Sequence, residues 1–193
     1  AQLKKEGLDP KPEIMIPLVS VVPELAKLRE LAEKIIAEVA EEQGVELEIP
    51  VGTMIELPRA AVTADEIATQ ADFFSFGTND LTQTTFGFSR DDVEAEFIPQ
   101  YLAERILPYN PFATVDPGVA KLVKMGVELG HQGNPDIVCG VCGAQPRVLR
   151  GRRFSAGCDG GVHLAVYHGK VLFHRYKLCR QPRVQQYCVG SFV

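Results

Sequence analysis

The sequence predicts an α/β fold in which strands and helices alternate along a parallel sheet. Residues 13–143 alternate between short apolar runs and amphipathic stretches with helical spacing, which is the pattern of consecutive β/α units. Each apolar run ends in a polar or glycine-rich loop. At 193 residues and 46% hydrophobic, the chain can bury a core of its own.

The first two expected units cover residues 13–71. Residues 13–19 predict a strand, and Ser20 is expected to cap a helix that Gly44 ends. A second strand is expected at residues 49–55. Thr63 and Glu66 then have the spacing of a capping box at the start of a short helix that ends near residue 71.

The third and fourth expected units complete a partial barrel. Residues 73–76 predict a strand, Asp116 and Pro117 predict the start of a helix that Gly130 ends, and residues 136–143 predict the last strand. No G-x-G-x-x-G follows any of these strands. The pattern therefore favours roughly the C-terminal half of a TIM (β/α)₈ barrel over a Rossmann domain.

Charge divides the chain into two parts. Residues 1–143 carry 11 Lys and Arg against 24 Asp and Glu, whereas residues 144–193 carry 9 against 1. We expect residues 1–143 to form the half barrel and residues 144–193 to be a divergent basic tail. The basic residues of the tail show no helical or alternating order, so no binding to nucleic acid is expected.

Neither a membrane segment nor a secretory signal is expected. No apolar run approaches the roughly 20 residues that span a bilayer. Residues 1–12 are charged and contain no apolar core run, so they resemble the interior of a longer protein rather than a signal peptide.

Cys139 and Cys142 have the C-x-x-C spacing of redox pairs and of half a zinc site. They lie within the strand expected at residues 136–143, where successive side chains point to opposite faces. No second C-x-x-C follows. A buried strand is therefore the stronger interpretation, and the five cysteines of the chain predict no disulfide framework.

Two carboxylates follow neighbouring strands and predict a magnesium site. Glu56 comes directly after the second strand, and Asp80 closes the loop Gly77–Asp80 after the third. Because adjacent strands lie roughly 4.8 Å apart, both carboxylates can reach one ion, and Mg²⁺ is often held by one or two carboxylates.

Gly77, Thr78 and Asn79 stand between the two carboxylates in the sequence and predict a site for substrate oxygen atoms. Gly77 lets a ligand approach the backbone, and the other two offer polar donors. The alternative is that Thr-Asn-Asp forms only a turn and a helix cap.

Three segments resemble the C-terminal domain of the pyruvate, phosphate dikinase family of phosphoenolpyruvate-utilising enzymes. They are residues 12–19, 52–61 and 73–92, and the resemblance extends over residues 12–143. Related families, the phosphoenolpyruvate synthases and the first enzyme of the sugar phosphotransferase system, share Gly-Thr-Asn-Asp, but residues 85–92 are similar to the dikinases.

The resemblance implies a (β/α)₈ domain that interconverts pyruvate and phosphoenolpyruvate. It implies Mg²⁺ bound by Glu56 and Asp80, with the substrate contacting Gly77, Thr78 and Asn79 as well. The implied partners are a separate phosphohistidine domain and an N-terminal ATP-binding domain in a homodimeric transferase. Such an enzyme is cytoplasmic in bacteria and lies in the plastid stroma in plants.

The chain has four histidines, and none of them lies in a phosphohistidine motif of the family. They are His131, His163, His168 and His174.

The sequence departs from the family after Gly143. The Glu-His-Gly-Gly that follows in the family is absent, and so is the later Tyr-Val-Ser-Cys-Ser-Pro segment, so none of Cys158, Cys179 and Cys188 is assigned as catalytic. The change suggests a shifted reading frame or an uncertain sequence. Resequencing the coding DNA and translating it in the other frames tests this.

The half of the barrel that supplies phosphoryl-binding arginines in the family is not in this sequence. We therefore expect the chain alone to be weakly stable and inactive. Two alternatives to a dikinase stay open: a phosphoenolpyruvate synthase or related phosphotransferase, and a non-catalytic fragment.

Overall fold

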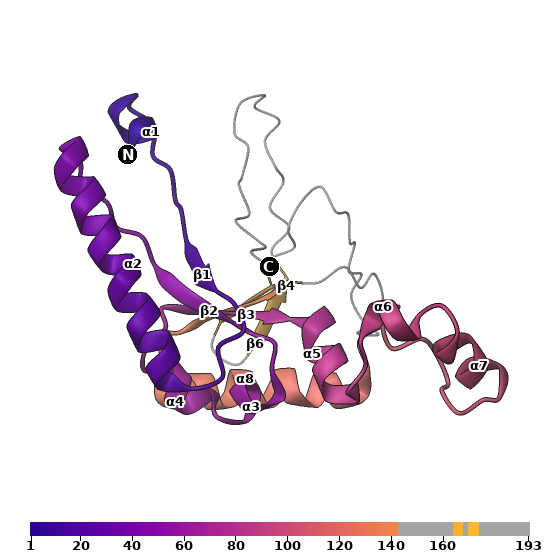
Figure 1. The fold of residues 1–193 in the computed structure, drawn as a ribbon. Coiled ribbons are helices and arrows are strands. Elements are labelled where there is room, and N and C mark those ends of the chain that lie inside the picture. The colour runs from indigo at the N-terminus through magenta and orange to yellow at the C-terminus, as the bar shows by residue number, and fades with distance from the viewer. Residues whose placement is uncertain (143–163, 168–169, 174–193) are drawn as a thin grey trace.

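The computed structural model describes residues 1–142, 164–167 and 170–173. The described strands form one sheet in the order β1-β2-β3-β4-β5-β6 (Figure 1). The first four strands pair in parallel and the last two pair antiparallel. Their bounds are β1 Ile14–Ile16, β2 Val51–Ile55, β3 Phe73–Gly77, β4 Val138–Cys142, β5 Leu164–Tyr167 and β6 Lys170–Phe173. The predicted α/β fold with a parallel sheet, a partial barrel, is confirmed.

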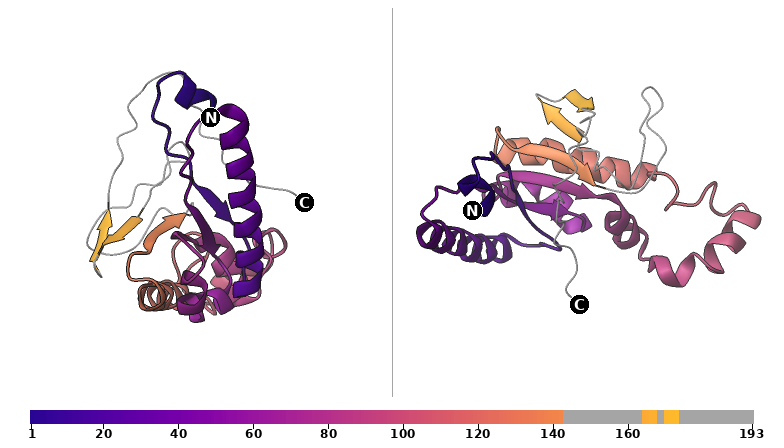
Figure 2. Two further views of the ribbon diagram at one scale, coloured as in Figure 1. Left: turned by 90° about the vertical axis from the view of Figure 1, so that its left-hand side faces the viewer. Right: turned by 90° about the horizontal axis from the view of Figure 1, so that it is seen from above.

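One short helix precedes β1, and the others connect the parallel strands. They are α1 Gln2–Lys5, α2 Val22–Gln43, α3 Pro58–Val62, α4 Ala64–Ala68, α5 Thr78–Phe86, α6 Arg90–Val93, α7 Phe97–Ala103 and α8 Pro117–Gly133. Helix α2 stands beside β1, while α3, α4 and α8 lie together on one side of the sheet (Figure 1). Figure 2 shows that α6 and α7 extend away from the sheet on the far side of α5.

The start of α2 is a correction to the sequence analysis. Its N-cap is Val21 rather than Ser20. The Glu24 carboxylate accepts hydrogen bonds from the backbone N–H groups of Ser20 at 2.9 Å and Val21 at 3.1 Å. The carboxylate of the first turn therefore satisfies the amides of the two residues that precede the helix, and no hydroxyl caps it. The helix ends at Gly44, which has φ +60°, as the sequence predicts.

The capping box expected at Thr63 does not form. Helix α3 ends at Val62 and α4 begins at Ala64, so Thr63 is the C-cap of α3 and the N-cap of α4. Its hydroxyl donates to the carbonyl oxygen of Arg59 at 2.9 Å, in the preceding helix. No side-chain hydrogen bond caps the start of α4.

Helix α8 begins as predicted but continues past Gly130. Asp116 Oδ1 accepts from Gly118 N at 2.6 Å, and Pro117 is the first helical residue. The helix runs to Gly133. Gly130 is needed for packing rather than termination, because a Cβ there would lie 2.8 Å from Cε2 of Phe74.

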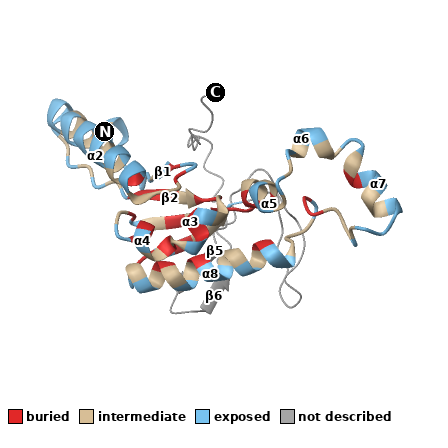
Figure 3. Cartoon of the chain, turned by 60° about the horizontal axis from the view of Figure 1, so that its bottom comes forward, coloured by how far each residue is buried: buried red, intermediate tan, exposed pale blue. Residues whose placement is uncertain are grey.

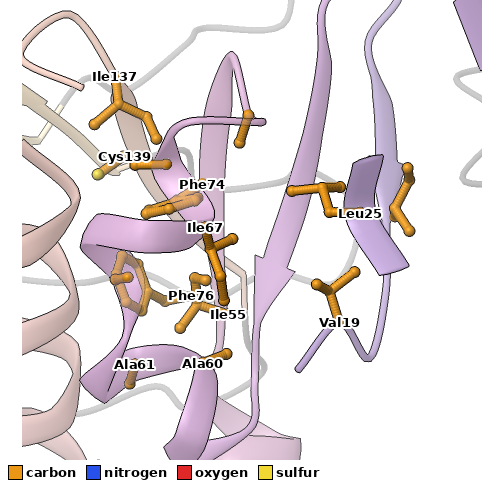
Figure 4. Close-up of a cluster of buried hydrophobic side chains, with 14 of the residues drawn as sticks. Val19, Leu25, Ile55, Ala60, Ala61, Ile67, Phe74, Phe76, Ile137 and Cys139 are labelled. Atoms are coloured by element: carbon orange, nitrogen blue, oxygen red, sulfur yellow. The ribbon is translucent and has the colours of Figure 1, made fainter. Parts of the chain in front are cut away.

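The core lies between the sheet and the helices on its covered side. Figure 3 shows the buried residues along β2, β3 and the inward faces of α3, α4 and α8. Phe74 and Phe76 pack edge to face with ring centres 6.5 Å apart. Figure 4 shows them among other fully buried apolar side chains, including Ile55, Ala60, Ala61, Ile67, Ile137 and Cys139. This packing fixes β2 and β3, the two strands that carry the candidate site.

The C-x-x-C pair is separated by the pleat of β4. Cys139 is buried, and burial raises the pKa of its thiol to about 12, whereas Cys142 is exposed.

Within residues 1–142 and the two short described strands beyond them, no three His, Cys, Asp or Glu side chains gather as a metal site. In the same residues no helix is long and apolar enough to cross a membrane. Most of the predicted tail, residues 144–193, lies outside the described residues.

Candidate functional site

Strand register brings the predicted site residues to one edge of the sheet. Ile55 of β2 is paired with Phe76 of β3, so the next residues, Glu56 and Gly77, lie side by side at the C-terminal ends of these strands. The C-terminal end of β1 lies at the same edge, because Ile16 is paired with Thr53. In parallel β/α folds this is the edge where active sites form.

Glu56 is a buried carboxylate. The residue is only 3% exposed, and its Oε1 accepts a hydrogen bond from the backbone N–H of Leu18 at 2.7 Å. Burial raises the pKa of Glu56 to about 7, although the Leu18 N–H opposes the increase, and the nearby Asp80 carboxylate adds to it. Burial favours the neutral acid because a charge loses hydration there.

Asp80 lies in the first turn of α5, and its carboxyl group is close enough to that of Glu56 to raise the pKa of Glu56. With a pKa of about 7, Glu56 is partly protonated near neutral pH, because its burial and the neighbouring Asp80 both disfavour its charge. The structure thus brings together the two carboxylates that the sequence placed on neighbouring strands. Their role as metal ligands remains a prediction.

Gly77 provides the space that Glu56 occupies. A Cβ on Gly77 would lie 2.6 Å from Met54 Sδ and 2.9 Å from Glu56 Oε2. Both distances are shorter than real Cβ atoms show. Any larger residue at this position must displace the thioether, the carboxylate or both.

Thr78 and Asn79 begin α5, beside the carboxylates. Thr78 is buried, and its hydroxyl makes a long contact of 3.5 Å with the carbonyl oxygen of Cys142. Asn79 Oδ1 is buried and has no hydrogen-bond partner among the described residues. The first amides of a helix have no partner within it and carry positive partial charge, so this end of α5 favours anionic groups.

Sequence reasoning missed three residues that support the carboxylates. Leu18, which donates to Glu56, has the left-handed φ of +55°. Thr84 Oγ1 donates to the carbonyl oxygens of Glu56 at 3.1 Å and Asp80 at 2.8 Å, which ties α5 to the end of β2. Gln83 Nε2 donates to Asp80 Oδ1 at 3.2 Å. Only Gln83 and Thr84 had a signal in the sequence, since they follow Asp80 by about one helical turn.

Comparison with known proteins identifies the family. The family described as "PEP-utilising enzyme, PEP-binding domain" matches residues 2–153. The chain belongs to this family. Pyruvate, phosphate dikinase of Clostridium symbiosum is 49% identical over 144 residues, which are 74% of this chain and 16% of that protein. The chloroplastic pyruvate, phosphate dikinase of Flaveria bidentis is 51% identical over 142 residues, or 73% of this chain and 15% of that protein.

The chain therefore spans only about a sixth of the length of these relatives. Among solved structures, a citrate lyase from Burkholderia xenovorans LB400 matches 70% of this chain and 37% of its own, with 18% sequence identity and a TM-score of 0.44.

The site of this PEP-binding domain has the chemistry that a magnesium ion requires. Two carboxylates adjoin each other, and among the described residues no Lys or Arg forms an ion pair with either. When both carboxyl groups are ionised, their like charges repel each other, and a divalent cation compensates them. Mg²⁺ commonly takes one or two carboxylates and fills its other positions with water and substrate oxygens. Glu56 and Asp80 fit that ligand set.

The predictions for the C-terminal part of the chain cannot be placed in this geometry. Cys158, Cys179 and Cys188 lie outside the described residues, and so do His163, His168 and His174. His131 is described, in the last turns of α8, which is the opposite end of the helix from the strand ends that carry the site.

Proposed function

We propose that this chain carries the pyruvate and phosphoenolpyruvate site of a pyruvate, phosphate dikinase. Such an enzyme converts ATP, phosphate and pyruvate to AMP, diphosphate and phosphoenolpyruvate. The observation that carries the proposal is the pair formed by the buried Glu56 and the half-buried Asp80 beside it, in a chain about 50% identical to proteins of that name.

In this proposal Glu56 and Asp80 hold Mg²⁺, and Gly77, Thr78 and Asn79 contact the substrate. A bound magnesium ion supplies positive charge for the carboxylate and carbonyl oxygens of pyruvate, which favours the enolate. The remaining work falls to the chain. Leu18 N holds the Glu56 carboxylate, and the amides at the start of α5 face the negative charge of the substrate.

The proposal requires domains that this chain does not supply. A phosphohistidine on another domain donates or accepts the phosphoryl group, and an ATP-binding domain charges that histidine. The full enzyme is proposed to be a homodimer without nucleic-acid or membrane partners. It is proposed to be cytoplasmic, or in the plastid stroma if the source is a plant, as the word chloroplastic in the names of plant relatives suggests.

Binding of oxalate, a mimic of the enolate, tests the site directly. We expect calorimetry to show oxalate binding only when Mg²⁺ is present, and to show none for Asp80→Ala. Asp136→Ala is the matched control, because Asp136 is exposed and lies before β4, at the other end of the sheet. Binding without Mg²⁺, or binding that survives in Asp80→Ala, would contradict the proposal.

A turnover assay separates the proposed reaction from that of a phosphoenolpyruvate synthase. The dikinase reaction consumes inorganic phosphate and forms diphosphate. Full-length enzyme whose rate does not depend on phosphate is therefore not a dikinase.

A further inference from the structure

We propose that Gln83 is a positioning residue that fixes the orientation of the Asp80 carboxylate and links it to the turn at the start of α6. This inference rests on the proposed function, because it concerns how a metal ligand is held. It assigns no contact with substrate or metal to Gln83 itself.

The two hydrogen bonds of Gln83 determine which way its amide points. Its Oε1 accepts from the backbone N–H of Arg90 at 2.8 Å, and its Nε2 donates to Asp80 Oδ1 at 3.2 Å. A backbone N–H can only donate, so the amide oxygen must face Arg90. The NH₂ group is thereby forced to face Asp80, and the reversed amide would lose both bonds.

A fixed donor beside Asp80 restricts the carboxylate. The side chain of Asp80 accepts a hydrogen bond from Gln83 and lies beside the carboxyl group of Glu56. Groups that hydrogen-bond a metal ligand orient it, and their loss typically lowers metal affinity by roughly 10-fold to 100-fold. Gln83 occupies that position relative to Asp80.

The same amide connects the site to the segment that leaves α5. Gly87 ends α5 with φ +68°, and Phe88 N donates to the carbonyl oxygen of Gln83 at 2.9 Å. Arg90 is the first residue of α6, and its side chain pairs with Glu94 at 3.0 Å and lies over the ring of Phe112. In Figure 1 this turn joins α5 to the projecting helices α6 and α7.

The aromatic side chains stiffen this turn. The rings of Phe86 and Phe88 stack with centres 5.4 Å apart, and Phe88 meets Phe97 of α7 at 5.3 Å. The position of the Arg90 N–H is therefore set by packing outside the site. Through Gln83, that packing determines how Asp80 is presented.

The test measures Mg²⁺ affinity by calorimetry on the full chain at about pH 8, where Glu56 is ionised, alongside thermal unfolding. Gln83→Met keeps the length of the side chain and removes both hydrogen bonds. We expect its Mg²⁺ affinity to fall about tenfold or more. A structural role alone would lower the melting temperature and leave the affinity of the folded protein unchanged.

A second pair of variants isolates the link to Arg90 without changing Gln83. Arg90→Pro removes the N–H, and proline suits the first position of a helix after the extended Ser89. Arg90→Ala loses the same side chain but keeps the N–H. We expect Mg²⁺ affinity to fall several-fold in Arg90→Pro relative to Arg90→Ala, because the amide of Gln83 is then free to rotate.

The outcomes separate this inference from the proposed function. A wild-type chain that binds no Mg²⁺ would contradict the proposed function on which the inference rests. A wild-type chain that binds Mg²⁺, together with unchanged affinity in Gln83→Met, would overturn the role of Gln83. Equal affinities in Arg90→Pro and Arg90→Ala would overturn the link to α6.

Discussion

At Gly77 the site has room for a hydrogen atom and nothing larger. A methyl group there would overlap Met54 Sδ at 2.6 Å and Glu56 Oε2 at 2.9 Å. We predict that Gly77→Ala moves the Glu56 carboxylate and lowers Mg²⁺ affinity about tenfold or more. Metal affinity typically falls by this amount when a metal ligand loses its orientation. Calorimetric titration with Mg²⁺ measures the change.

The double variant Met54→Ala, Gly77→Ala tests the reason for that loss. It removes the overlap with sulfur and keeps the overlap with the carboxylate. The affinity should stay low. Recovery of full affinity in the double variant would show that the thioether, rather than Glu56, transmits the effect.

The pKa of Glu56 predicts how stability depends on pH in the absence of metal. The folded chain raises this pKa to about 7 from its ordinary value of 4.5, so the folded state binds the proton more tightly than the unfolded state. The resulting stability is fully present below about pH 4.5 and is lost as the pH rises towards 7. We predict a melting temperature that falls across this window and then becomes level.

Glu56→Gln provides the control for this pH dependence, because an amide does not titrate in the window. Its melting temperature should vary less between about pH 5 and pH 8 than that of the wild type. Mg²⁺ should bind more weakly below pH 7, where it competes with the proton on Glu56. A wild-type curve parallel to that of Glu56→Gln would contradict the raised pKa.

The residues of the site were predictable only where side-chain type carries the signal. Glu56 and Asp80 could be located because carboxylates after neighbouring parallel strands must converge. Leu18 could not, because it acts through a backbone N–H and adopts a left-handed φ of +55° that bulky residues rarely take. Nothing in a leucine indicates either property. The role of Gly77 likewise has no signal in the sequence, because the atoms that it makes room for lie on the neighbouring strand and at its end.

At the scale of elements, Arg29 joins α2 to the N-terminal ends of β2 and β3. Its guanidinium donates to the carbonyl oxygen of Gln70 at 3.1 Å and to the Asp72 carboxylate at 3.0 Å, and Asp72 also accepts from Val51 N at 2.8 Å. The side chain of Arg29 is 24% exposed. It therefore ties three elements together at the end of the sheet opposite the site.

We predict that Arg29→Met lowers the free energy of unfolding by about 1–3 kcal/mol, because it leaves the partly buried carbonyl oxygen of Gln70 without its side-chain donor and removes one of the donors to Asp72. Mg²⁺ affinity should not change, since the substitution lies far along the strands from Glu56. Denaturant unfolding measures the loss.

Lys34→Met in the same helix is the matched control. Lys34 pairs with Glu38 at 3.8 Å, and its side chain is 70% exposed, so the pair contributes about 0–1 kcal/mol. Comparable losses in Arg29→Met and Lys34→Met would show that Arg29 does not hold the three elements together.

Elements with a sustained hydrophobic pattern or strong end signals were predictable, and some of the short helices were not. The four parallel strands and the start of α8 at Asp116 lie where the sequence indicates. Helices α6 and α7, of 4 and 7 residues, were not foreseen, because so few residues show no helical period. Gly130 was misread as a helix end because its purpose, close contact with Phe74, lies in a distant part of the chain.

At the scale of the whole molecule, the sheet is open on the side of β1. In the described residues β1 pairs only with β2. Between β1 and α2 lies a groove of about 440 Å³ lined by apolar side chains. On α2, Leu28, Leu31 and Ile35 are 44%, 53% and 49% exposed. An unpaired strand edge beside apolar surface favours association with other chains.

We predict that the chain on its own self-associates, unfolds at low denaturant concentration and shows no dikinase turnover. The double variant Leu31→Lys, Ile35→Lys should shift the isolated chain towards monomer, as measured by analytical ultracentrifugation. Because both side chains are already about half exposed, the change in unfolding free energy should stay within about 1 kcal/mol. Leu25→Lys, at a fully buried position of the same helix, should instead unfold the chain. An isolated wild-type chain that is monomeric and binds no hydrophobic dye would contradict the view that β1 and α2 need further protein packed against them. So would dikinase turnover by the isolated chain.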